Sequence, residues 1–76
     1  MKKHEIEALR EKNRVDSIKI VRSPSDASEW VVLFKAEGGK SFFLISDDDQ
    51  VCSYANLDAA VEALDALGFT RAEVLF

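Results

Sequence analysis

The feature that most constrains the fold of this chain is a pair of strand-like segments that are apolar on both sides. Residues 30–36 (Trp-Val-Val-Leu-Phe-Lys-Ala) and residues 41–46 (Ser-Phe-Phe-Leu-Ile-Ser) are rich in aromatic and β-branched residues, which favour strands. Residues 37–40 (Glu-Gly-Gly-Lys) predict a tight turn between them, because two glycines supply positive φ angles. Successive strand residues alternate between faces, so both faces of this hairpin are apolar.

The segments before the hairpin predict a helix and a strand. Residues 2–14 contain strong helix formers but few apolar residues, and Asn13 is a plausible end for this helix. Residues 15–21 alternate apolar and polar side chains in the manner of a strand. Residues 23–28 are polar, contain the only proline, and predict a loop.

The segments after the hairpin predict two further strands and a second helix. Residues 47–50 predict a turn, and residues 51–54 a short strand. Asn56 is placed as the N-cap of a helix that Gly68 ends. Residues 71–76 complete the pattern as a final strand. The helix carries one continuous apolar stripe, formed by Leu57, Ala60, Val61, Leu64 and Leu67.

These segments predict an α+β fold in a single domain, residues 1–76, with the order α-β-β-β-β-α-β. The simplest packing is one antiparallel sheet of four to five strands with two helices on one face. A chain of 76 residues is short for a second domain and leaves little room for a deep active-site pocket.

Two helices cover one face of such a sheet, which leaves the apolar residues of the other face without a partner. Antiparallel sheets that face water usually alternate apolar and polar residues. One interpretation is a sheet that curls over scattered, harmlessly exposed apolar residues. The other is an interface with another chain, including a second copy. The residues predicted for the interface are Val31, Leu33, Phe43 and Ile45. The opposite register, predicted as core, is Trp30, Val32, Phe42 and Leu44. A slip of one residue would exchange the two sets.

The charge distribution leaves a nucleic-acid partner open as an alternative. The formal charge is −4, yet residues 1–22 carry seven basic and four acidic residues, a net of +3. Basic groups could contact phosphates, and aromatic side chains of the sheet could stack on bases. The stacking candidates are Trp30, Phe42, Phe43 and Tyr54. The basic candidates are Arg10, Lys12, Arg14, Lys19 and Arg22. The overall negative charge argues against tight binding.

The sequence gives little support for catalysis, for a metal site or for a cofactor. Cys52 and His4 are the candidate nucleophile and base, but no basic residue adjoins Cys52 in the sequence to lower its pKa. Residues 47–49 are three aspartates without the spacing of a calcium loop, so they are interpreted as a polar turn. We therefore expect a protein that is not an enzyme and binds no cofactor or metal.

Cysteine content and hydropathy indicate a cytoplasmic protein. No apolar run approaches the roughly 18 residues of a membrane span. The basic opening residues are followed by a charged segment, so no export signal is expected. Cys52 is the only cysteine, which fits a reducing compartment.

The last third of the chain resembles a family of small accessory proteins. Residues 51–60 (Val-Cys-Ser-Tyr-Ala-Asn-Leu-Asp-Ala-Ala) and residues 64–69 (Leu-Asp-Ala-Leu-Gly-Phe) are similar to the tails of such proteins in bacterial plasmids and integrative elements, often near partition or maintenance genes. The resemblance implies a bacterial mobile-element protein and supplies no site residues.

The sequence therefore predicts a cytoplasmic, non-enzymatic protein-interaction module, with a homodimer as one form of it. The alternative is a nucleic-acid-binding accessory protein that uses the basic N-terminal segment. A third interpretation is an acidic surface over residues 47–65 that meets a basic partner. The sequence names no partner and no biological process.

Overall fold

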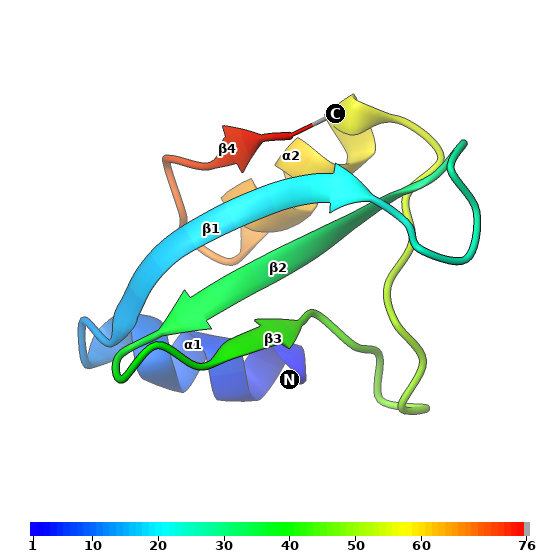
Figure 1. The fold of residues 1–76 in the computed structure, drawn as a ribbon. Helices are drawn as coiled ribbons and strands as arrows, with labels where there is room; N and C mark the ends of the chain where they lie inside the picture. The colour runs from blue at the N-terminus through cyan, green and yellow to red at the C-terminus, as the bar shows by residue number, and fades with distance from the viewer. Residues whose placement is uncertain (76) are drawn as a thin grey trace.

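Helix α1 (Lys3–Glu11) opens the chain in the computed structural model, which describes residues 1–75 (Figure 1). The helix has a thin apolar stripe, and Ile6 is its one fully buried residue. Asn13 ends it as predicted: its φ of 55° is left-handed, and its N–H donates to the Arg10 carbonyl. The Arg14 N–H donates to the Leu9 carbonyl, which completes a C-terminal cap of the Schellman type.

Three strands follow, and they pair as an antiparallel meander. Strand β1 (Val15–Arg22) pairs with β2 (Trp30–Ala36), and β2 pairs with β3 (Ser41–Phe43). The predicted bounds of the first two strands agree with these to within one residue. Between β2 and β3, Gly38 and Gly39 have φ angles of 92° and 84°, so the hairpin turn uses both glycines in the left-handed region.

The predicted strand over residues 51–54 is wrong. Val51 forms an isolated bridge with Ile45, and Tyr54 forms one with Trp30, but no continuous ladder connects them. The turn before this segment closes through the Asp49 N–H, which donates to the Ser46 carbonyl, and Asp49 has a φ of 61°. The Cys52 N–H then donates to the Leu44 carbonyl, and Tyr54 exchanges two backbone hydrogen bonds with Trp30 at the edge of β2 that β3 leaves.

Helix α2 (Leu57–Ala66) begins and ends where the sequence predicts. The Asn56 side-chain oxygen accepts a hydrogen bond of 2.8 Å from the Ala59 N–H. At the other end Gly68 has a φ of 89°, and its N–H donates to the Asp65 carbonyl. The Phe69 N–H donates to the Leu64 carbonyl, so this end is also a Schellman cap.

The last strand corrects the predicted sheet. Strand β4 (Glu73–Val74) pairs with β1, and the two are parallel, so the sheet is mixed with the order β3-β2-β1-β4. Helix α2 causes this, because it carries the chain from the end of the sheet where β3 finishes back to the end where β1 starts (Figure 1). The final strand then runs in the same direction as β1. Of the predicted segment 71–76, Phe76 lies outside the described residues.

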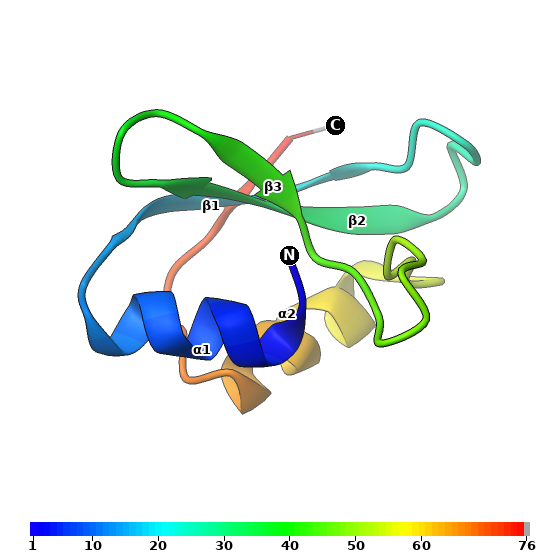
Figure 2. The ribbon, with the colours of Figure 1, turned by 90° about the horizontal axis from the view of Figure 1, so that it is seen from below.

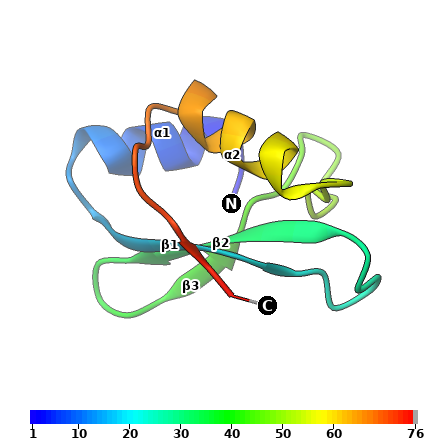
Figure 3. The ribbon, with the colours of Figure 1, turned by 90° about the horizontal axis from the view of Figure 1, so that it is seen from above.

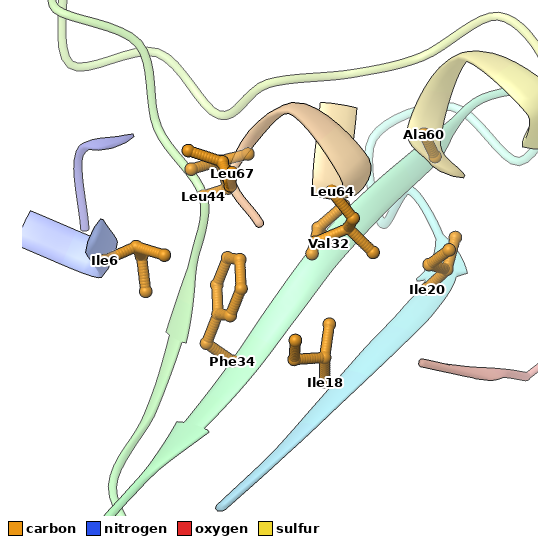
Figure 4. Close-up of a cluster of buried hydrophobic side chains, with 9 residues drawn as sticks. All are labelled: Ile6, Ile18, Ile20, Val32, Phe34, Leu44, Ala60, Leu64 and Leu67. Carbon is orange, nitrogen blue, oxygen red and sulfur yellow. The ribbon is translucent and has the colours of Figure 1, made fainter. Parts of the chain in front are cut away.

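Both helices lie on the same face of the sheet, as Figures 2 and 3 show from opposite sides. Side chains from both helices and from the sheet meet in one core between these two layers (Figure 4). The Phe69 ring extends this core, 5.7 Å from the ring of Phe34. The buried core residues are Ile6, Ile18, Ile20, Val32, Phe34, Leu44, Ala60, Leu64 and Leu67.

Candidate functional site

The face of the sheet opposite the helices is the candidate site, and we call it the open face. The pairing register defines it. Lys19 lies opposite Leu33, which lies opposite Phe43, and these residues alternate with the core residues of each strand. The residues assigned to the open face in this way are Ser17, Lys19, Val21, Val31, Leu33, Lys35, Ser41, Phe43 and Glu73.

The predicted core register is the one that the structure adopts. Val32 and Leu44 are fully buried among the helices, and Trp30 packs against them. Phe42 pairs with the core residue Phe34 across β2 and β3. The helix layer therefore selects the even-numbered residues of the hairpin and leaves the odd-numbered residues of β2 and β3 on the open face.

The four predicted interface residues occupy three different environments. Leu33 and Phe43 are direct cross-strand partners on the open face, and both are partly exposed. Val31 lies on the same face but has no exposed surface, so it supports the face from within. Ile45 lies just beyond β3 and is half-buried, where it bridges Lys2 on one side and Val51 on the other.

Polar and apolar residues are arranged in rows across the open face. The row nearest the β2–β3 turn is polar and consists of Ser17, Lys35 and Ser41. The middle row runs from Glu73 through Lys19 to Leu33 and Phe43. The next row contains the paired valines Val21 and Val31. The apolar part of the face is therefore flanked by charge on one side.

Leu75 adds an apolar residue at the edge of this face that sequence reasoning missed. Its N–H donates to the Ile20 carbonyl, and alternation along the strand places it on the side of Glu73. It is 40% exposed. The sequence signals the final strand but not its neighbour, so it could not place Leu75 beside β1.

The structure separates the aromatic residues proposed for base stacking. Trp30 and Tyr54 pack against the helix-side core, and Phe42 shares the side of Phe34. Phe43 is the one of these four that lies on the open face. A single ring offers one stacking position, whereas single-strand binding uses successive rings along a groove.

The basic residues proposed for phosphate contact are also dispersed. Arg10 packs on Gly68, and Lys12 is the C-cap of α1. The Nε of Arg14 lies 3.6 Å from a carboxylate oxygen of Glu37. Arg14 lies just before β1 and Arg22 is its last residue, so the two are about 25 Å apart at roughly 3.3 Å per residue.

Two of these basic residues lie along β1. Lys19 belongs to the open face. The Arg22 guanidinium lies 4.5 Å from the centre of the Trp30 ring and donates to the Ala27 carbonyl. The contacts of Arg10, Arg14 and Arg22 thus involve three different parts of the chain.

The two candidate groups for catalysis lie in helix α1 and in the segment that follows β3. His4 is exposed in the first turn of α1. Cys52 is a free, half-buried thiol whose N–H donates to the Leu44 carbonyl. Burial raises the pKa of Tyr54, and the neighbouring Cys52 raises it further. Within residues 1–75, no group of three potential metal-ligating side chains comes together.

A groove of about 600 Å³ lies between the start of β1 and the segment that joins α2 to β4. Its lining includes Arg10 and Arg71 together with Asp16 and Glu73. These charges oppose one another, and Arg10 is engaged with Gly68. The groove therefore presents no convergent set of groups for a ligand of one charge.

Comparisons with known proteins add no further identification. Neither helix in residues 1–75 has the length and apolar character needed to cross a membrane. No protein-family model, no curated protein and no solved structure matches this chain.

Proposed function

We propose that this protein is a non-enzymatic interaction module that binds another polypeptide through the open face of its sheet. One observation carries the proposal: both helices lie on the same face, so Leu33 and Phe43 remain partly exposed on a helix-free sheet. A sheet face that only meets water usually alternates polar residues with the apolar residues of the core.

The composition of the open face fits a protein interface. Its apolar residues adjoin one another across β1, β2 and β3, and its end near the β2–β3 turn is polar. Interfaces likewise combine apolar contacts with a hydrated polar rim. Large aromatic side chains are frequent among the residues that contribute most to binding. We therefore expect Phe43 to be the principal contact and Leu33 to be its neighbour.

A polypeptide fits this face better than a nucleic acid. The face carries two lysines, Lys19 and Lys35, against one glutamate, Glu73, and the whole chain has a charge of −4. Phosphate binding requires several cations on one surface. The open face offers two, and one of them has an acidic neighbour in the adjacent strand.

Site-specific photocrosslinking in the source cells tests the proposal. A photoreactive phenylalanine analogue at position 43 should form adducts with another polypeptide. The same analogue at Val61 is the matched control, because Val61 is 50% exposed on the helix side of the molecule. Adducts at position 43 and none at position 61 would support the open face. Equal adducts at both positions, or none at either, would contradict it.

A further inference from the structure

Strand β4 leaves part of the edge of β1 unpaired. It pairs with Lys19 and Ile20, so the stretch before them, Val15–Ile18, has no strand beside it on this side. Within residues 1–75, no backbone hydrogen bond joins residues 69–72 to this stretch. An unpaired strand edge presents backbone N–H and C=O groups that pair with another extended chain. We call Val15–Ile18 the free edge of β1.

The groove between β1 and the segment that joins α2 to β4 runs along the free edge. One wall is the free edge itself, and the other consists of residues 68–73, with apolar surface from Phe69 and Ala72. The free edge is about 13 Å long at roughly 3.3 Å per residue, the length of four extended residues. The groove therefore has room for a short extended chain.

The backbone of β1 offers hydrogen-bonding groups to this groove. The Leu75 N–H donates to the Ile20 carbonyl, so the backbone groups of Ile20 point to this edge. Strand residues two apart present their backbone groups to the same side, so the Ile18 N–H points to the same edge. The β-bulge at Asp16 leaves this residue without a partner in β2. A peptide backbone supplies the complementary groups.

The charged side chains of the groove favour a ligand that carries both signs of charge. Arg10 and Arg71 line the groove together with Asp16 and Glu73. Within residues 1–75, no ion pair joins any of these four side chains to another charged group. A purely anionic ligand would meet two carboxylates, and a purely cationic one would meet two guanidinium groups. A chain with acidic and basic side chains is complementary to both.

We propose that this groove binds a short extended peptide that carries acidic and basic side chains and adds as a strand to the free edge of β1. The peptide lies beside residues 15–18, as β4 lies beside Lys19 and Ile20. The inference goes beyond the function proposed above, because it uses the edge of the sheet and not its open face. Ser17 and Glu73 are the two residues that these surfaces share.

Selection from a phage-displayed library of short random peptides, followed by NMR of the full chain, tests this inference. We expect enriched peptides to contain both acidic and basic residues and to bind with a Kd between about 1 μM and about 1 mM. In the isotope-labelled protein, the bound peptide should shift the amide signals of Ile18 and Ala72 and leave those of Leu33 and Phe43 unchanged. Shifts centred on Leu33 and Phe43 would place the peptide on the open face and contradict the inference.

Methylation of the peptide nitrogens tests the strand pairing. The N–H groups of an extended peptide point to alternate sides, so one set faces β1 and the other faces away. Methylation of one set should weaken binding at least ~10-fold, and methylation of the other set should weaken it much less. Equal effects of the two sets would contradict the addition of a strand.

Neutral variants test the side-chain contacts. Asp16→Asn combined with Arg71→Gln should weaken binding about 10-fold. Asp48→Asn combined with Lys40→Gln is the matched control, because both residues are exposed, lie outside the groove and keep the net charge unchanged when replaced together. Equal affinities of the two double variants would overturn the inference, as would a library that yields no peptide with a Kd below about 1 mM. Crosslinking at position 43 tests the open face separately, so the failure of either proposal leaves the other standing.

Discussion

At the scale of single residues, Gly68 ends helix α2 and also lies against Arg10, which is far from it in the sequence. The positive φ of Gly68 closes the cap of α2, which the sequence predicts. The structure adds a second requirement: a Cβ at this position would lie 2.9 Å from the Arg10 Cζ. Helix α2 has no basic residue in its last turn, so Arg10 of α1 supplies positive charge near its C-terminal carbonyls.

Replacing Gly68 should cost about as much as replacing a glycine in the same conformation without a close neighbour, because only the flexible end of the Arg10 side chain must move aside. Gly68→Ala should lower the free energy of unfolding by about 1–2 kcal/mol for the left-handed backbone. Gly38→Ala is the matched control, since Gly38 has a φ of 92° and a Cβ there would meet nothing within 4 Å. Urea denaturation measures both. A clearly larger loss for Gly68→Ala would mean that Arg10 cannot move aside.

Tyr54 should make the protein less stable in alkali. Its pKa is raised above 10.0, mainly by burial and then by Cys52. The unfolded chain therefore loses the phenol proton at a lower pH than the folded chain. Stability from this group is fully present below pH 10 and is lost as the pH rises through the folded pKa.

Urea denaturation between pH 8 and pH 11, as a function of pH, checks this prediction for Tyr54. Tyr54→Phe keeps the ring and removes the titrating group, so its stability should fall less steeply above pH 10. All other residues are the same in both proteins, so the difference between the two curves isolates Tyr54. Parallel curves for wild type and variant would contradict the raised pKa.

At the scale of elements, helix ends are set by local chemistry and strand pairing is not. Both helices end at residues that the sequence predicts, because a cap depends on the side chain and backbone of a few adjacent residues. The segment 51–54 has strand-like composition, yet its pairing depends on which strand edge remains open beside it. Tyr54 finds the edge of β2 that β3 leaves, whereas Val51 meets Ile45, so the segment forms isolated bridges instead of a ladder.

The N-cap of α2 should be the most sensitive exposed position of that helix. Asn56→Ala removes the acceptor of the Ala59 N–H and should cost about 1 kcal/mol, which lowers Tm by roughly 4–8 °C in a domain of this size. Asn56→Asp retains an acceptor and is the control. Thermal unfolding followed by circular dichroism measures both. Similar melting temperatures for the two variants would contradict a capping role.

At the scale of the whole molecule, the fold is two layers, and one side of the sheet layer remains without helices. The hairpin is apolar on both faces, and the helices cover one of them, which leaves the other as the open face. This asymmetry carries the proposed function. As a consequence, two neighbouring residues of β2 have different roles: Val32 is part of the core, and Leu33 lies on the open face.

Lysine substitutions at these two neighbours should therefore give opposite results. Val32→Lys places an unpaired ammonium in the core, which costs several kcal/mol, as much as the few kcal/mol that stabilise a domain of this size. Leu33→Lys should retain the wild-type circular dichroism spectrum and a cooperative unfolding transition. Circular dichroism with urea denaturation distinguishes them. Unfolding of both variants would show that the open face is required for the monomer fold.

The sequence by itself determined the features that arise within one element or between adjacent ones. These are the ends of both helices, the first two strands, the β2–β3 turn, and the alternation of the hairpin residues between two registers, without saying which register is the core. Periodicity, turn residues and caps act over a few residues, so they can be recognised in the sequence before the tertiary structure is known.

Only the tertiary structure decided which surfaces meet. It placed β4 parallel to β1 and brought Leu75 to the edge of the open face. It fully buried Val31, which had been predicted to contact a partner. It also dispersed the basic residues of the first 22 positions around the molecule. Each of these results depends on contacts between segments distant in the chain, whose geometry follows from the packing of α2 against the sheet.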